Sequence, residues 1–385
     1  MKLSKIAVLI TATLATTSLN VFAETESKTT LDLNLRYESV DQDNALKDAS
    51  ALTLRTRLNY TSASYNGFTG VVEFEDSRVI AGVDDYNNTN GVNAGVYSVI
   101  ADPESTELDQ AFVQYKSDKF IAKIGRQVIT LDGHRFVGHV GWRQDRQTFD
   151  AATFAYNATD KLAGSYSYIS KRNRVFAEAK DIDSKDHLLN VSYKSSVGKV
   201  VGYAYLLQVD NSTDNGIDTY GVSLTGKKEQ FSYAVELAIQ SNDASDADTT
   251  YTMVEGGYNF GKVTAKLGYE LLGSDKGVGF ATPLATAHKF NGWADQFLGT
   301  PGVGLEDIYA TAVGKILGGK LSVTYHNFSA DEGSADLGNE IDAIYAKGFN
   351  KHYKAGIKLA SYSAGEAGTG KVDTDKVWLF VSAKF

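Results

Sequence analysis

Hydrophobic and polar residues alternate with a period of two along most of this chain. In LTLRTRLNY, residues 52–60, the leucines and the tyrosine share one set of positions with Thr56, whereas Arg55 and Arg57 fall on the other set. Successive side chains of a β-strand point to opposite faces, so the pattern predicts a strand with one apolar and one charged face. About 18 such segments of about 8–11 residues recur along the chain, and this is the length that a tilted strand needs to cross a bilayer.

The connectors between these segments alternate between short and long. The long connectors are residues 77–106, 127–146, 171–184, 241–248, 273–305 and 362–373. Short turns at one end and long loops at the other are typical of outer-membrane barrels, and closing the sheet pairs every backbone N–H and C=O group without water. We therefore predict an all-β fold: a transmembrane antiparallel β-barrel of about 18 strands, with short periplasmic turns and long extracellular loops. The apolar faces would contact lipid, and Arg55 and Arg57 would face a water-filled lumen.

The last segment supports a membrane location. In VWLFVSAKF, residues 377–385, alternate residues from Val377 to Phe385 share one apolar face. A C-terminal amphipathic strand that ends on Phe resembles the assembly signal of bacterial outer-membrane proteins, so the barrel-assembly machinery is an expected partner. A secreted soluble β protein would show the same alternation, but it explains neither this segment nor the loop lengths. The expected location is the outer membrane of a Gram-negative bacterium, in contact with lipid and lipopolysaccharide.

Residues 1–23 have the features of a secretory signal peptide. Lys2 and Lys5 form a short positive start, an apolar run follows, and small residues precede the predicted cleavage point. The run is too short and too often interrupted for a transmembrane anchor, and no later stretch predicts a spanning helix. We expect residues 24–385 to form a single barrel domain, whose net charge becomes −11 because two lysines are removed from a chain of net charge −9.

Composition and motifs argue against several other classes of function. The absence of cysteine excludes disulfides and thiolate chemistry, and the acidic balance argues against a nucleic-acid partner. The six histidines are scattered, no G-x-S-x-G motif occurs, and GEAGTGKV, residues 365–372, has Val372 where a phosphate-binding loop needs Ser or Thr. The acidic runs 181–186 and 243–248 are interpreted as solvated loop charges rather than calcium ligands. We therefore expect no enzymatic activity, no cofactor and no metal site.

Arginines are the main candidates for contact with a solute. Guanidinium groups bind carboxylates in a bidentate manner, and a ring of them inside a low-dielectric wall would form a cationic constriction. The alternative is charge pairing, in which nearby carboxylates use the arginines to brace the wall, and the sequence leaves both possibilities open. The candidates are Arg36, Arg55, Arg57, Arg126, Arg135, Arg143 and Arg146, and the possible partners are Glu38, Glu73, Glu75, Asp109, Asp145 and Asp150.

Two long loops are further candidates for the lumen. Residues 280–305 carry Lys289 and Trp293, a cation and an aromatic ring of the kind that binds sugar hydroxyls and sugar faces. The alternative for this loop is a lid packed by its own aromatic residues. Residues 77–106 are rich in Asn, Gly and Asp, and they predict either a folded-in plug or a mobile surface loop.

Two stretches resemble a known family. GRQVITLDGHRFVGHVGWRQDRQTFDAATFAY, residues 125–156, and FATPLATAHKFNGWADQFLGTPGVGLEDIYATAV, residues 280–313, are similar to segments of the alginate-export family of outer-membrane porins. The resemblance implies an 18-stranded monomeric barrel, and the assignment of Arg126 to Arg146 to the pore rests more on it than on alternation. The best-known members of the family export an acidic polysaccharide through an arginine-lined pore, whereas many relatives resemble uptake porins.

The expected function is passive diffusion of hydrophilic solutes through a hydrated lumen. The preferred solutes are anionic sugars, oligosaccharides or other organic anions. Two alternatives remain: a general diffusion porin for small hydrophilic solutes, and a plugged barrel that serves as a surface receptor or adhesin.

Overall fold

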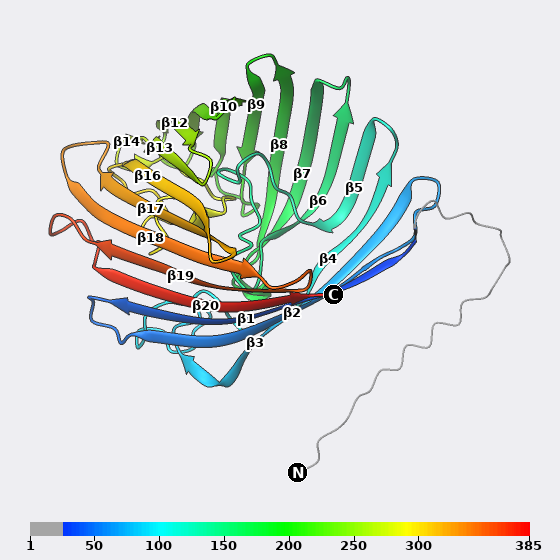
Figure 1. Cartoon of the computed structure of the whole chain (residues 1–385). Coiled ribbons are helices and arrows are strands. Elements are labelled where there is room, and N and C mark those ends of the chain that lie inside the picture. Colours follow the sequence, from blue (N-terminus) through cyan, green and yellow to red (C-terminus); the bar gives the residue numbers. More distant parts are fainter. Residues whose placement is uncertain (1–25) are drawn as a thin grey trace, which may run out of the picture.

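The structure is a computed structural model that describes residues 26–385, and the predicted signal peptide lies outside the described residues. Eighteen strands form one sheet (Figure 1). They are β1 Lys28–Gln42, β2 Ala49–Thr61, β3 Phe68–Asp85, β4 Ser105–Lys116, β5 Phe120–Gln127, β6 Thr148–Asn157, β7 Leu162–Asn173, β8 Ile182–Ser195, β9 Gly198–Leu207, β10 Ile217–Lys228, β11 Phe231–Asn242, β12 Ala247–Asn259, β13 Val263–Leu272, β16 Leu305–Ile316, β17 Gly319–Ser329, β18 Asp336–Gly348, β19 Tyr353–Ser363 and β20 Thr374–Lys384. The loops hold a small hairpin, β14 Ser274–Asp275 and β15 Val278–Gly279, and two 3₁₀ turns, η1 Glu178–Lys180 and η2 Ala287–Lys289. Among residues 26–385, no helix is long and apolar enough to cross a membrane.

The sheet closes on itself between its first and last strands. β1 pairs antiparallel with β2 on one side and with β20 on the other, with Leu35 opposite both Leu54 and Val381. The seam extends to the last residue, because the N–H of Phe385 donates to the carbonyl oxygen of Leu31 at 2.9 Å. A closed sheet leaves no edge with unpaired backbone groups in lipid. The prediction of an antiparallel barrel of about 18 strands is therefore confirmed.

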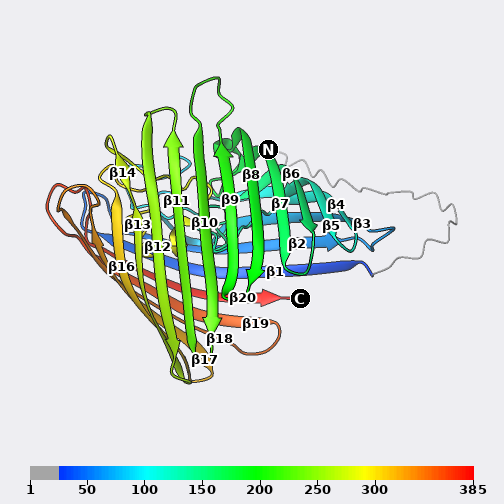
Figure 2. The same cartoon turned by 90° about the horizontal axis from the view of Figure 1, so that it is seen from above.

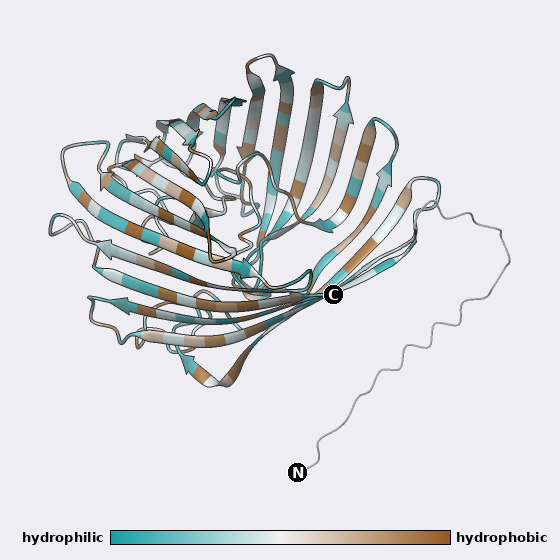
Figure 3. Ribbon diagram, viewed as in Figure 1, coloured by the Kyte–Doolittle hydropathy of each residue, from teal (hydrophilic) through white to brown (hydrophobic). Residues whose placement is uncertain are grey.

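The two faces of the wall differ as the alternation predicts. Leu58 in β2 and Phe74 in β3 are 47% and 55% exposed on the outside, whereas Arg55 and Arg57 are 7% and 8% exposed on the inside. Figure 3 shows the brown apolar and teal polar residues alternating along the strands. Apolar side chains on the outer face suit contact with hydrocarbon, and the charges on the inner face are sheltered from it.

The connectors follow the expected rhythm, with two corrections. The loop predicted at residues 77–106 is shortened to residues 86–104, because β3 continues to Asp85 and still pairs with β2 after a bulge. The connector predicted as long at residues 241–248 is a short turn, residues 243–246. In both places the strand pairing continues past the last clearly alternating residues, so the sequence pattern ended the strands too early.

The interior of the barrel holds a packed core made by the loops. The N–H of Gly138, in the β5–β6 loop, donates to the carbonyl oxygen of Leu284 in the β13–β16 loop at 2.8 Å. Phe136 from the first loop and Phe280 from the second pack with Tyr251 of the wall, with ring centroids 5.1–5.8 Å apart. Figure 2 shows β8–β12 along one wall and β1 and β2 on the opposite wall, and Figure 1 shows loops between the walls. The lumen is therefore occupied by inserted loops.

Candidate functional site

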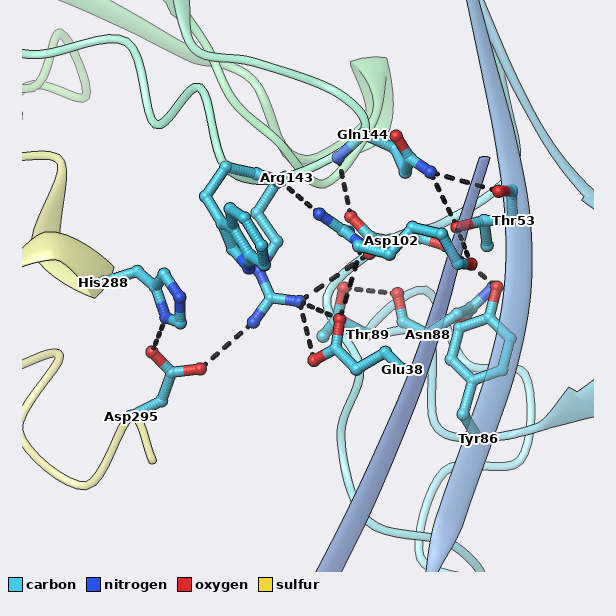
Figure 4. A network of polar contacts seen from close by, with 12 residues as sticks. Glu38, Thr53, Tyr86, Asn88, Thr89, Asp102, Arg143, Gln144, His288 and Asp295 are labelled. Atoms are coloured by element: carbon cyan, nitrogen blue, oxygen red, sulfur yellow. Dashed lines mark hydrogen bonds and ion pairs between the residues drawn. The ribbon is translucent and has the colours of Figure 1, made fainter. Parts of the chain in front are cut away.

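Three inserted loops meet the wall at a group of buried ionisable residues, which we call the loop-junction cluster, and Figure 4 shows part of it. The β3–β4 loop is residues 86–104, the β5–β6 loop is residues 128–147 and the β13–β16 loop is residues 273–304. The cluster consists of Arg36 and Glu38 of β1, Asp102 of the β3–β4 loop, Arg143 of the β5–β6 loop, His288 and Asp295 of the β13–β16 loop, Lys358 of β19 and Lys376 of β20.

Arg143 connects two of the loops to the wall. Its Nη1 donates to Glu38 Oε2 at 3.1 Å, and its Nη2 donates to Asp295 Oδ2 at 3.1 Å. The neighbouring N–H of Gln144 donates to Asp102 Oδ1 at 2.8 Å, and Asp102 also accepts a hydrogen bond from Arg36. Charge-assisted hydrogen bonds between buried partners hold geometry firmly, so the positions of these loops depend on one another.

Asp295 is the most heavily coordinated carboxylate of the cluster. Its Oδ1 lies 2.5 Å from His288 Nδ1, and its Oδ2 accepts from Lys376 Nζ at 2.7 Å and from Arg143 Nη2 at 3.1 Å. Burial alone would raise the pKa of Asp295, but His288, Lys376 and Arg143 hold that pKa well below its ordinary value. Burial lowers the pKa of His288 to about 3, so its ring is neutral at pH 7 and donates from Nδ1 to Asp295.

Lys358 lies on the other side of the His288 ring. Its Nζ donates to His288 Nε2 at 2.5 Å. It also lies 4.2 Å from the ring centroid of Trp142, 3.9 Å from that of Trp293 and 4.9 Å from that of Trp378. No carboxylate within residues 26–385 is close enough for an ion pair with this amine. The amine of Lys358 is therefore enclosed by three indole rings and one imidazole nitrogen.

Each of the seven predicted arginines has a carboxylate partner in this structure. Besides Arg36 and Arg143, Arg126 contacts Asp150 at 2.8 Å, Arg135 contacts Glu270 at 2.7 Å and Arg146 contacts Asp109 at 2.7 Å, while Arg55 pairs with Asp32 and Arg57 pairs with Glu75. The structure brings Arg36 together with Arg143, and Arg57 together with Arg146, but it does not gather all seven. This is the geometry of charge pairing, and a pore-lining role for the arginines stays a prediction.

Lys289 and Trp293 line a cavity of about 340 Å³ that lies between the β13–β16 loop and the wall. Lys289 Nζ donates to the carbonyl oxygen of Gly133 at 2.7 Å, and the N–H of Trp293 donates to Asp342 Oδ2 at 3.2 Å. The ionisable groups that line this cavity are Arg135, Lys266, Lys289, Glu236, Glu255, Glu270, Asp307, Asp342 and His326. Carboxylates therefore outnumber fixed cations here.

A second cavity, of about 310 Å³, is lined only by loop residues, among them Arg143, His288 and Asp295. It lies on the long-loop side of the barrel. Within residues 287–298, Lys289 and Trp293 line the first cavity, whereas His288 and Asp295 line the second. This segment therefore separates the two cavities. No group of three or more His, Asp or Glu side chains within residues 26–385 is arranged to hold a metal ion.

His288 and Asp295 lie within residues 280–305, the long loop that the sequence offered as a candidate for the lumen, but sequence reasoning assigned no site role to Lys358, Lys376 or Asp102. A signal for the two lysines was present. In YKAGIKLAS and KVWLFVSAKF, Lys358 and Lys376 occupy the polar set of positions and so face inward. Asp102 carried no such signal, because it lies in a loop without periodicity.

Comparisons with known proteins agree with this barrel. A family model described as alginate export matches residues 23–272, and no curated protein matches the chain by sequence. The solved structure of OccAB4 from Acinetobacter baumannii is similar with a TM-score of 0.69 and 16% identity, over 94% of this chain and 98% of that chain. OccAB1 from the same organism gives a TM-score of 0.72 and 12% identity over 93% and 96% of the two chains. The outer membrane protein opdK from Pseudomonas aeruginosa gives a TM-score of 0.68 and 12% identity over 93% and 99%. At these identities the likenesses show the fold.

Proposed function

The chain belongs to the alginate-export family, and from this premise we propose that it is a porin through which hydrophilic solutes diffuse passively. The closed barrel with its apolar outer face lies in the Gram-negative outer membrane, as the sequence predicts. The observation that carries the proposal is the pair of cavities inside the barrel, one on each side of residues 287–298, each of which has charged side chains in its lining. Passage follows the solute gradient and involves no chemical step.

The preferred solutes are organic anions, including anionic sugars and oligosaccharides. The support for this preference is one group of cations at Asp295, and not a ring of free guanidinium groups around the lumen. Arg143 and Lys376 converge on Asp295, where two cations from different elements meet at one edge of a cavity. A solute carboxylate presented there would meet donors that are already oriented, so little reorganisation is needed.

A general diffusion porin without anion preference is the second candidate. Two observations favour it. The predicted arginines are all paired with carboxylates, which cancels much of their field. The cavity of about 340 Å³ has more carboxylates than fixed cations in its lining. The third possibility, a plugged receptor barrel, draws support from the loop core that occupies the lumen.

Electrical recording separates these candidates. Purified protein in a planar bilayer conducts if it is a porin, and a bilayer that stays sealed would refute the proposed function. Under a KCl gradient, the sign of the reversal potential reports whether anions or cations pass more readily. Oligomers of a uronic acid should block the current more strongly than neutral oligomers of equal length. Equal block by both, with no reversal potential, would favour the general diffusion porin.

A further inference from the structure

Resting on the proposed porin function, we propose that Asp295 occupies a built-in carboxylate-binding site, and that the carboxylate of an organic-anion solute binds there by replacing it. The site is formed by Arg143 Nη2, Lys376 Nζ and His288 Nδ1. In this structure the carboxylate of Asp295 therefore occupies the position that the carboxylate of the solute would take. The class of ligand is a small molecule that carries a carboxylate group.

The arrangement of donors is that of a complete carboxylate site. One oxygen of Asp295 faces His288, and the other accepts from both Arg143 and Lys376. The three donors come from the β13–β16 loop, the β5–β6 loop and strand β20, so no single element creates the site. The four side chains are each 5–8% exposed. A free carboxylate offers the same two oxygens in the same plane as Asp295 does.

The site is reachable from the long-loop side of the barrel. Arg143, His288 and Asp295 all line the cavity of about 310 Å³, whose lining residues all come from loops. A solute that enters between the extracellular loops meets this cavity before it meets residues 287–298. The volume of about 310 Å³ is in the range of small-molecule sites, so it can hold an organic acid or a single sugar acid.

Charge balance explains why the replacement must itself be anionic. Among residues 26–385, Asp295 is the one carboxylate within ion-pair distance of Lys376, which is buried. Moving Asp295 away without a substitute would leave a buried cation unpaired, which is strongly unfavourable. A solute carboxylate restores the pair, whereas a neutral sugar does not. The exchange therefore discriminates by charge although carboxylates outnumber fixed cations in the cavity of about 340 Å³.

In this exchange the Asp295 side chain rotates while its backbone stays in place, and a further amine lies close to the site. The backbone beside Asp295 is held by the N–H of Ala294, which donates to Glu340 Oε1 at 2.7 Å. On the other side of His288 lies the amine of Lys358, which has no carboxylate within ion-pair distance among the described residues and contacts the ring of Trp293 that lines the other cavity. Hydrogen-bond donors thus lie on both sides of the His288 ring, between one cavity and the other.

The test replaces the internal carboxylate. Asp295 has a left-handed backbone with φ of +64°, which Asn tolerates well, so Asp295→Asn removes the charge with little change of shape. The full chain is recorded in planar bilayers with glucuronate as the probe and glucose as the neutral control. We expect glucuronate to block Asp295→Asn at a concentration at least tenfold lower than it blocks the wild-type protein, and glucose to affect neither. Asp214→Asn, the same change on an exposed loop residue, should behave like the wild-type protein.

Two further measurements keep the proposal open to refutation. Adding Lys376→Met to Asp295→Asn should abolish the gain in block, because it removes the freed cation. Acetate should raise the thermal midpoint of Asp295→Asn in detergent and leave that of the wild-type protein unchanged. If Asp295→Asn fails to fold, the single variant Lys376→Met is recorded instead. Glucuronate should block this variant less strongly than it blocks the wild-type protein. Equal block of the wild-type protein and Asp295→Asn would overturn the carboxylate site but not the porin, whereas a wild-type protein that does not conduct would overturn the porin itself.

Discussion

Arg135 offers the sharpest test of whether buried ion pairs hold the inserted loops in place. Its Nε donates to Glu270 Oε1 of β13 at 2.7 Å, and its Nη2 donates to Asn291 Oδ1 of the β13–β16 loop at 3.0 Å. Its guanidinium carbon also lies 4.8 Å from the ring centroid of Phe290. One side chain of the β5–β6 loop is thus joined to the wall and to a second loop. Replacing Arg135 by Met should loosen both loops.

The expected loss of stability follows from the unpaired carboxylate of Glu270 that Arg135→Met leaves behind. Glu270 keeps hydrogen bonds from Tyr251 Oη and Asn291 Nδ2, both at 2.6 Å, but it loses its compensating charge. Removing one partner of a buried ion pair costs about 3–5 kcal/mol, and the two remaining donors place Arg135→Met near the lower end. At about 1.4 kcal/mol per factor of ten, a cost of about 3 kcal/mol raises the population of displaced loops about 150-fold. Arg135→Met with Glu270→Gln should recover most of this loss, since no buried charge is then left unpaired.

Single-channel recording and thermal unfolding in detergent are the assays. We expect Arg135→Met to show frequent transitions between conductance levels and a lower thermal midpoint, and the double variant to resemble the wild-type protein. The control is Lys185→Met, which removes an exposed ion pair with Asp210 and should leave the thermal midpoint and the conductance nearly unchanged. The reasoning would be refuted if Arg135→Met were as quiet as the wild-type protein, or if the double variant were as noisy as Arg135→Met.

Three other variants test the lumen charges, the buried acids and the outer face. Arg55→Ala combined with Arg57→Ala should shift the reversal potential toward cations if these side chains line the conducting path, and an unchanged potential would identify them as braces of the wall. Burial, followed by the charge of Glu107, raises the pKa of Asp145 well above its ordinary value. When folding raises the pKa of an acid, the folded protein loses stability as the pH rises above the unfolded pKa of about 3.9. Asp145→Asn should therefore be more stable than the wild-type protein at pH 7 and equally stable below about pH 4. Unfolding curves that coincide at both pH values would contradict this. Leu237, which is 48% exposed in the middle of β11, should tolerate Arg poorly, with a loss of about 2–4 kcal/mol in unfolding from lipid, and a loss below about 1 kcal/mol would argue that this face does not contact hydrocarbon.

Alternation along single strands determined most of the architecture. Because side chains of a strand point alternately to two faces, residues 52–60 already separate the leucines that face outward from Arg55 and Arg57 that face inward. Closure follows from the same local pattern, since a sheet with an apolar outer face has no other way to satisfy its backbone in lipid. Short stretches of sequence therefore suffice to predict the number of strands and the inward position of Arg36.

The candidate site was decided by contacts between distant parts of the chain. Arg143 and Glu38 are 105 positions apart, and Arg135 and Glu270 are 135 positions apart. Loops have no period, so the sequence could name Arg143 and place Asp295 in a long loop but could not show that they meet. Only the closed barrel brings the two loops and strand β20 to one point, where Lys376, Arg143 and His288 converge on Asp295. The energy of a buried charge depends on its nearest partners, and those partners are set by the tertiary structure.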